Sequence, residues 1–167
     1  TTGVSVVVAA ADKTDYKVNT DLCGKRLSAA KGTDASRIIT ELAKKCSADG
    51  KKTTANQFPD DNAGLLAVRS GRIDGHAMDS ISASYEASTE KGHTTFRNVL
   101  PDFAPTKALY GFVIAKGNKS LTDATALVVN DMIADGSYQA VLKKYGVADA
   151  AIPSATINAG GTQSSAE

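Results

Sequence analysis

A regular alternation of strand and helix patterns between residues 25 and 100 most constrains the fold of this chain. Short apolar or β-branched runs predict strands, at 25–30, 53–58, 72–79 and 95–100. Helical periodicity between them predicts helices, at 34–46, 61–70 and 80–90. Such alternation is typical of an α/β protein whose sheet is at least partly parallel. We therefore predict an α/β fold with a central mixed sheet flanked by helices.

Further elements are predicted on both sides of this region. A β-branched run over 4–10 predicts a buried strand, and the segment "ALYGFVIAKG" predicts another at 108–117. Two helices are expected to close the fold, over 121–135 and 138–145. The small polar residues of the C-terminal tail predict a frayed end.

Length and charge limit the function classes that fit. The chain has 167 residues, which suits one compact domain or two small lobes. Its formal net charge of +1 and its lack of Trp argue against nucleic acid or an anionic membrane as a partner. No apolar run reaches the length of a membrane span. The apolar residues at the N-terminus lack a basic flank, so we interpret them as a strand and not as a signal peptide.

The two cysteines, Cys23 and Cys46, leave two interpretations open. They are either two unrelated buried thiols or a disulfide between the ends of adjacent elements. They make a poor metal set, because no histidine lies near them. A bridge would stabilise the fold by roughly 3 kcal/mol and would place the protein outside the reducing cytosol.

Two segments meet the requirements of a ligand site. In α/β sheets, ligands lie beyond the carboxyl ends of strands, against helix N-termini. The first segment is Gly32-Thr33-Asp34, where Thr33 caps a helix whose free N–H groups can bind a carboxylate. Asp34 stabilises the helix dipole but would repel a carboxylate. We therefore expect Asp34 to point away from the ligand, or the ligand to bring a compensating cation.

The second segment is the end of the 72–79 strand, where the candidate residue is Asp79. It is either the N-cap of the following helix or the counter-ion of an ammonium group. A carboxylate site and an ammonium site in one cleft would recognise a zwitterion, the backbone of a free amino acid.

The other candidates are interpreted as structural. These are His76 in a strand, His93 in a turn, Asp60 and Asp61 as caps, and Asp74 as a partner of Arg72 or a loop cap. No Ser-His-Asp order, HExxH, P-loop or GxGxxG motif is present. We predict neither a metal nor a cofactor.

Four segments together resemble a known family. They are "DLCGKRLSAAKGTDAS", "LLAVRSGRIDGHAMDS", "LYGFVIAKGN" and "MIADGSYQAVLKKYGV". In this order and spacing they are similar to the extracytoplasmic solute-binding proteins of ABC transporters for polar amino acids. The resemblance covers about residues 5–158.

The resemblance implies a periplasmic-binding-protein type II-like lobe. Members of the family have two α/β lobes joined by two hinge strands. On that pattern 1–9 is a hinge strand (Val4–Val8) with a remnant of lobe 1, and 10–111 is lobe 2. Residues 112–158 are a second hinge strand (Phe112–Ala115) and the C-terminal helices of lobe 1, and 159–167 are a disordered tail.

The resemblance also implies roles for single residues. Thr33 and Asp34 fall where the family contacts the ligand carboxylate, although Asp34 stands where threonine or glycine is usual. Asp79 falls where the family binds the α-ammonium group. The Cys23/Cys46 pair looks like a disulfide that a subset of the family carries.

The implied function is binding of an amino acid outside the cytoplasm and delivery to the membrane permease subunits of an ABC transporter. The protein would be periplasmic or extracellular, with a lipid anchor as one option, and the acidic residues favour a basic amino acid. A degenerate sensor or interaction module and a dehydratase-type enzyme are the alternatives. The opening segment of lobe 1 has no counterpart in this sequence, so we expect exposed apolar surface and self-association or domain swapping.

Overall fold

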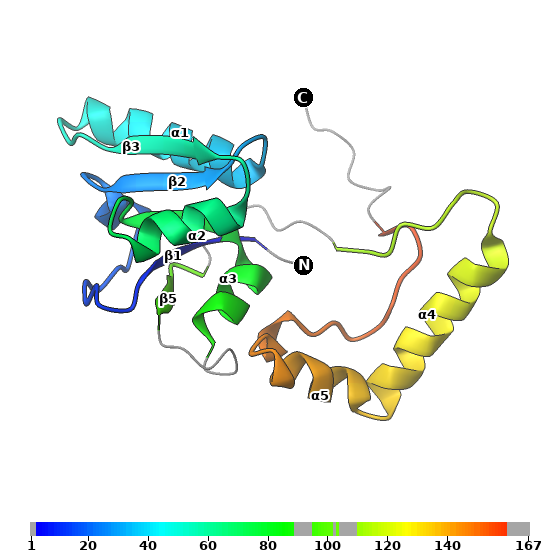
Figure 1. Ribbon diagram of the computed structural model, residues 1–167. Coiled ribbons are helices and arrows are strands. Elements are labelled where there is room, and N and C mark those ends of the chain that lie inside the picture. The colour runs from blue at the N-terminus through cyan, green and yellow to red at the C-terminus, as the bar shows by residue number, and fades with distance from the viewer. Residues whose placement is uncertain (1–2, 89–94, 102, 104–109, 160–167) are drawn as a thin grey trace. The chain divides into compact units, whose positions relative to one another are not determined.

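The protein was analysed as a computed structural model, which describes residues 3–88, 95–101, 103 and 110–159 (Figure 1). The chain divides into two compact units, residues 2–107 and 108–167. The assignment of these parts to the two lobes of a binding protein stays a prediction. His93, the predicted helix end at Glu90 and the tail from residue 160 lie outside the described residues.

The N-terminal unit alternates strands and helices as predicted. Its elements are β1 (Val4–Ala9), a short 3-10 turn (Asn19–Leu22), β2 (Arg26–Ala30), α1 (Asp34–Ala48), β3 (Thr54–Phe58), α2 (Asp61–Arg69), β4 (Gly75–Asp79), α3 (Ser80–Ala87) and β5 (Phe96–Val99). The described boundaries agree with the predicted ones to within a few residues.

The five strands form one mixed sheet in the order β3-β2-β4-β1-β5. β2 runs parallel to β3 and β4, whereas β1 runs antiparallel to β4 and β5. The predicted fold class is therefore confirmed. β1, which we assigned to a hinge, lies inside this sheet, and its role as a hinge stays a prediction.

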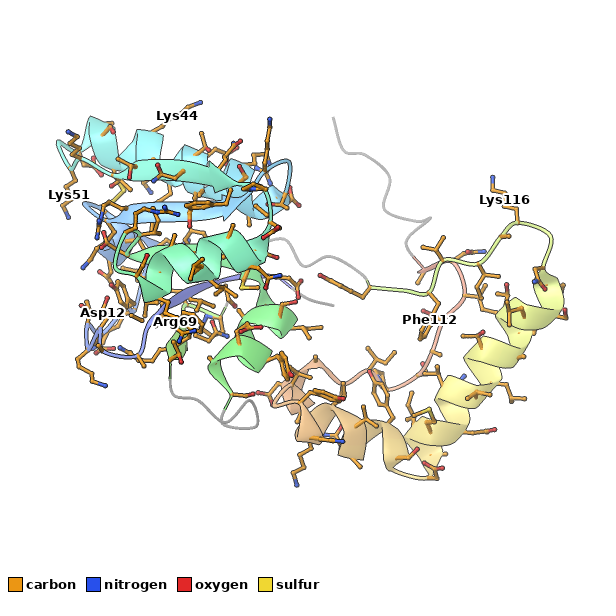
Figure 2. All side chains as sticks on the ribbon, in the orientation of Figure 1. Asp12, Lys44, Lys51, Arg69, Phe112 and Lys116 are labelled. Carbon is orange, nitrogen blue, oxygen red and sulfur yellow. A yellow bond between two sulfur atoms is a disulfide. The ribbon has the colours of Figure 1, made fainter. Side chains whose placement is uncertain are left out.

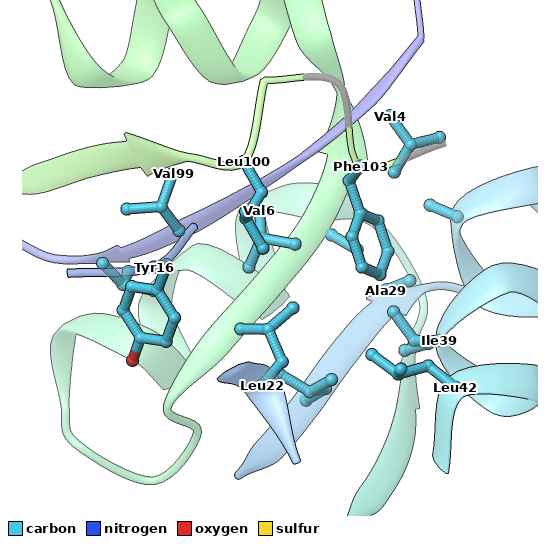
Figure 3. Close-up of a cluster of buried hydrophobic side chains, with 14 of the residues drawn as sticks. Val4, Val6, Tyr16, Leu22, Ala29, Ile39, Leu42, Val99, Leu100 and Phe103 are labelled. Atoms are coloured by element: carbon cyan, nitrogen blue, oxygen red, sulfur yellow. The ribbon is translucent and has the colours of Figure 1, made fainter. Parts of the chain in front are cut away.

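The core lies on both faces of the sheet, because side chains alternate along each strand. On one face Val6 packs with Ile39 and Leu42 of α1, together with the other side chains in Figure 3. On the other face Val7 packs with Leu65 of α2 and Ala83 of α3. β1 is thus buried on both sides, which explains why four of its six residues are valine.

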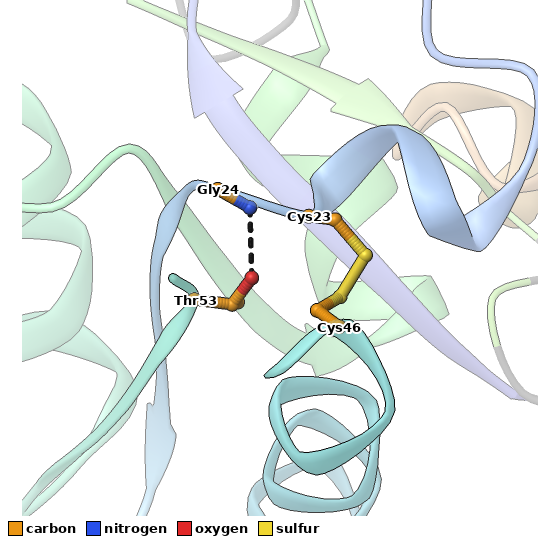
Figure 4. Close-up of a disulfide and its surroundings, with 4 residues drawn as sticks. All are labelled: Cys23, Gly24, Cys46 and Thr53. Atoms are coloured by element: carbon orange, nitrogen blue, oxygen red, sulfur yellow. Dashed lines mark hydrogen bonds between the residues drawn. A yellow bond between two sulfur atoms is a disulfide. The ribbon is translucent and has the colours of Figure 1, made fainter. Parts of the chain in front are cut away.

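A disulfide joins Cys23 to Cys46, as the second of our two interpretations predicted (Figure 4). Their Cα atoms are 5.4 Å apart, and Cys46 in the last turns of α1 is completely buried. The adjacent N–H of Gly24 donates to Thr53 Oγ1 at 2.7 Å. The bridge therefore holds the C-terminal end of α1 to the segment that leads into β2.

Two predicted polar roles are wrong. Asp74 pairs with Arg26 and not with Arg72: its carboxylate accepts from Arg26 Nη2 at 2.6 Å and from Arg26 Nε at 3.1 Å. These hydrogen bonds hold the pKa of Asp74 below its usual value. The N-cap of α2 is Asp60, whose Oδ1 accepts from the N–H of Ala63, whereas Asp61 is the first helical residue.

The C-terminal unit contains the two predicted helices, α4 (Lys119–Ala134) and α5 (Ser137–Lys144), followed by a 3-10 turn at Ala148–Ala150. Gly136 between them has a φ of +82°, a backbone conformation that glycine adopts without strain. No residue of α4 or α5 is buried. None of the helices in the described part of the chain is long and apolar enough to cross a membrane.

The strand predicted at 108–117 is wrong for the part that the structure describes. Residues 110–115 form neither strand nor helix, although they are rich in residues that favour strands. The side chain of Phe112, labelled in Figure 2, is 78% exposed, and that of Val113 is fully exposed. A strand forms only by hydrogen bonding to a neighbour, and no strand pairs with this segment among the described residues.

Candidate functional site

Two helices begin at the same edge of the sheet. β2 and β4 are parallel, with Ala29 opposite Ala77, so their carboxyl ends lie side by side. Three residues separate the end of β2 from the start of α1, and α3 follows β4 directly. The N-termini of both helices are therefore neighbours at this edge, where α/β proteins usually bind ligands.

The turn after β2 presents the start of α1. Gly32 has a φ of +79°, which the tight turn requires. Thr33 is the N-cap, as predicted: its Oγ1 accepts from the N–H of Ser36 at 3.2 Å and donates to the carbonyl of Ala30 at 2.7 Å. Within the described part of the chain, no group accepts from the backbone N–H of Asp34 or Ala35. These two donors are available to an anion.

Asp34 lies on the solvent side of this helix start. Its side chain is 74% exposed, and Oδ1 accepts from Arg37 Nε and Nη2 at 3.3 Å. Arg37 also donates to Glu41, and its hydrogen bonds to Glu41 and Asp34 raise the pKa of the guanidinium, with Glu41 as the larger cause. Asp34 thus has a cation of its own beside it, which reduces its repulsion of a nearby anion.

Asp79 forms the start of α3. Its Oδ1 accepts from the N–H groups of Ile81 at 3.0 Å and Ser82 at 3.2 Å, so it caps the helix. The residue is half-buried and lies opposite Val4 of β1. This confirms the structural role weighed from the sequence, whereas the ammonium-binding role stays a prediction.

A shallow groove of about 470 Å³ adjoins the start of α1. It follows the exposed side of α1, where Figure 2 labels Lys44, and it includes Thr33 and Asp34 but not Asp79. Its lining residues are Gly32, Thr33, Asp34, Ser36, Arg37, Thr40, Glu41, Lys44 and Gln57. Gln57 of β3 donates to Ser36 Oγ at 2.8 Å. The sequence analysis missed Gln57 and Ser36, because only the pairing of β3 with β2 brings them together.

His76 is structural, as predicted, but it is also the centre of a polar chain that the sequence analysis missed. Its ring contacts Ser28 of β2 and Asp61 of α2. The sequence signal was the position of His76 beside apolar neighbours in a buried strand. The described residues contain no group of three or more His, Cys, Asp or Glu side chains placed to hold a metal ion.

No protein-family model and no curated protein matches this sequence. Several solved structures are similar to it. An ancestral cationic amino acid solute-binding protein matches with a TM-score of 0.70 and 23% identity, over 87% of this chain and 58% of that one. The second substrate-binding domain of GlnP from Lactococcus lactis, in an open conformation, matches with a TM-score of 0.63 and 23% identity, over 86% and 58%.

A third similar structure is the second substrate-binding domain of a putative amino acid ABC transporter from Streptococcus pneumoniae. It matches with a TM-score of 0.60 and 19% identity, over 87% of this chain and 61% of that one. The chain therefore has the α/β fold of amino-acid ABC transporter substrate-binding proteins over most of its length. It spans about three fifths of the length of those solved structures.

Proposed function

We propose that this chain is the main ligand-binding part of an extracytoplasmic protein that captures a free amino acid and delivers it to the permease subunits of an ABC transporter. The observation that carries the proposal is the pair of neighbouring helix starts, with Thr33 at one and Asp79 at the other. The similar solved structures support binding as the role, and not catalysis, because they are solute-binding proteins.

Each end of the ligand would meet a different helix start. The carboxylate accepts from the backbone N–H groups of Asp34 and Ala35, where the helix dipole favours an anion. The α-ammonium group donates to the carboxylate of Asp79. Both helix starts lie at one sheet edge, so both can contribute to a site for a molecule whose two charged groups are bonded to one carbon atom.

Basic amino acids are the favoured ligand class. Asp60 caps α2 and Asp61 begins it, after β3 ends at the same sheet edge. Asp34 at the start of α1 is paired with Arg37, so Asp60 and Asp61 supply the acidic charge that suits a ligand with a cationic side chain. An ancestral arginine-binding protein bound to arginine is among the similar structures.

A location outside the cytoplasm fits the disulfide, because such bridges persist in oxidising compartments. Uptake would follow closure of a second lobe over the ligand, since contacts made only in the closed state favour that state. Attachment through a lipid anchor and free diffusion in the periplasm both fit this mechanism.

A thermal-shift panel tests the proposal. Twenty amino acids, ornithine and cystine are added to the chain and to Asp79→Asn, a variant that keeps a good N-cap and removes the charge. Ligand at one hundred times its dissociation constant should add about 2.7 kcal/mol to the free energy of unfolding. We expect a shift with basic amino acids that is lost in Asp79→Asn.

Asp79→Ala is the matched control, because it removes the charge and the cap together. It should also lose about 1 kcal/mol of stability without ligand. If the unmodified chain shows no shift with any compound, and still none when joined to a complementary lobe, the binding function is wrong. A thermal shift that persists in Asp79→Asn would show that the charge of Asp79 does not bind the ligand.

We also propose that the chain associates with itself through its C-terminal unit. The unit exposes large apolar side chains on α4, on α5 and its C-cap, and on the segment before the helices: Tyr110, Phe112, Val113, Leu121, Leu127, Val128, Val141 and Tyr145. Its four lysines and five acidic residues nearly cancel, so net charge opposes association only weakly. This surface is also the observation that favours the alternative function, an interaction module.

Light scattering during size exclusion measures the association. The apparent mass should exceed the 17.2 kDa of one chain and should fall in Val113→Asp, which places a charge at the fully exposed position of the apolar segment. Ser120→Asp, an equal charge change at an exposed polar residue, should leave the mass unchanged. A single-chain mass at every concentration would contradict the proposal.

A further inference from the structure

We propose that Ser28, His76 and Asp61 form a buried hydrogen-bonded clamp that sets the spacing of the two helix starts, with His76 as the positioning residue. His76 and Ser28 are completely buried, although one is ionisable and both are polar. Ser28 Oγ lies 2.9 Å from His76 Nδ1, and Asp61 Oδ1 lies 3.0 Å from His76 Nε2. The clamp connects β2, β4 and α2.

The partners of the ring assign its tautomer. An ionised carboxylate only accepts hydrogen bonds, so Nε2 must carry the proton that is donated to Asp61. In the neutral ring Nδ1 is then an acceptor, and it receives the hydroxyl proton of Ser28. Every polar atom of the imidazole is thereby satisfied, as a buried ring requires.

The same three residue types occur in hydrolytic triads, but this arrangement has no access for a substrate. The serine is completely buried between the sheet and α2. The backbone of α2 also lies directly on the ring, because a Cβ placed on Gly64 would lie 2.1 Å from His76 Cε1. The ring therefore holds α2 against the sheet and leaves no space for chemistry at Ser28.

The clamp lies within the short stretch over which β2 and β4 pair, and so it bears on the register between the two strands. The two strands pair over only three residue pairs, and Ser28 opposite His76 is the middle one. A slip of one residue would move a strand end by about 3.3 Å and turn its side chains to the other face. Asp79 lies three residues after His76, so such a slip would displace it from the edge where α1 begins.

The spacing of the two helix starts matters because the proposed ligand is an amino acid, and here the inference rests on the proposed function. The carboxylate and ammonium groups of an amino acid are bonded to one carbon atom, so the two helix starts must stay at one separation. Backbone pairing over three residue pairs leaves the register to be specified mainly by what the side chains require on each face. The directional side-chain bonds of the clamp add to that specification.

Two substitutions of His76 separate positioning from packing. His76→Gln offers an amide N–H to Asp61 and a carbonyl to Ser28, whereas His76→Leu has neither. Backbone amide NMR signals of Ser36 report on the cap of α1, and those of Ile81 and Ser82 report on the cap of α3. We expect these signals to move clearly in His76→Leu and much less in His76→Gln, without any ligand present.

Imidazole nitrogen NMR of the unmodified chain tests the tautomer, with His93→Ala to assign the only other histidine. A proton on Nε2 and none on Nδ1 supports the clamp, and a proton on Nδ1 at neutral pH overturns it. If His76→Leu does not fold, Ser28→Ala removes one hydrogen bond at almost no change in volume. Unmoved cap signals in a folded His76→Leu, or in Ser28→Ala if that is the variant used, overturn the proposal.

Binding of L-arginine to the full chain separates this inference from the proposed function. Affinity should fall about tenfold or more in His76→Leu and stay within about threefold in His76→Gln. Equal affinity in both variants overturns the clamp. If the unmodified chain does not bind L-arginine but the cap signals respond as expected, the clamp stands and the ligand assignment fails.

Discussion

Replacing Gly64 with alanine is expected to lower the free energy of unfolding by about 2 kcal/mol. The new methyl group would lie 2.1 Å from Cε1 and 2.2 Å from Nδ1 of the His76 ring, which is completely buried and cannot move aside. Overpacking of this kind costs up to about 3 kcal/mol, and the better helix propensity of alanine returns about 1 kcal/mol. Urea unfolding followed by circular dichroism measures the change.

Two further variants show whether the ring is the cause. Asn62→Ala gains helix propensity at an exposed position of the same helix turn and should be neutral or slightly stabilising. The double variant Gly64→Ala/His76→Ala should be more stable than the sum of the single changes predicts, because the small side chain at 76 makes room for the methyl group. Additive effects would contradict the close contact.

Loss of the disulfide is expected to lower the free energy of unfolding by roughly 3 kcal/mol. The bridge closes a loop across a sequence separation of 23 residues, so cutting it restores freedom to the unfolded chain. Cys23→Ala/Cys46→Ala is the suitable variant, since alanine leaves no polar atom in the buried site of Cys46. Thermal unfolding with and without a reducing agent measures the effect.

The reducing agent provides its own control. It should lower the unfolding midpoint of the unmodified chain and leave that of the alanine variant unchanged. Equal midpoints for the oxidised and reduced chain would show that the bridge contributes little to stability. The shift in unfolding midpoint that L-arginine causes can also be compared between the oxidised and the reduced chain. This comparison would show whether the disulfide, at the far end of α1, affects the ligand edge where α1 begins.

Local patterns were sufficient to predict most elements of the N-terminal unit. The stripe of Ile39, Leu42 and Cys46 and the cap at Thr33 define α1 without reference to any other part of the chain. The valine-rich run of β1 likewise predicts a buried strand. These signals lie within single elements, so one sequence is enough to find them.

Features that depend on partners far along the chain were not predicted. Residues 110–115 have the composition of a strand, but composition cannot supply a neighbouring strand to pair with. Asp74 was given the wrong partner because Arg72 is near in sequence, whereas Arg26 is near in space through the pairing of β2 with β4. The clamp at His76 depends on the same pairing.

The candidate site was predicted only in part, because some of its residues come together only through the pairing of distant elements. Thr33 lies in the turn that follows β2 and Asp79 is the last residue of β4, so the rule that ligands lie at carboxyl ends finds both from local signals. The exposure of Asp34 and its pairing with Arg37 follow from helical spacing, although we did not foresee the partner. The groove residues Gln57 and Ser36 come from two different elements and had no signal in common.

The antiparallel direction of β1 places the beginning of the described chain beside α3. The N–H of Gly3 donates to Ser80 Oγ at 3.0 Å, and the N–H of Ser80 donates to the carbonyl of Gly3 at 2.9 Å. A dye attached at residue 3 itself, through a Gly3→Cys variant, therefore lies next to the start of α3, which Asp79 caps. Such a fluorophore is well placed to report whether the edge is occupied, whereas a bulky label at the same position risks blocking it.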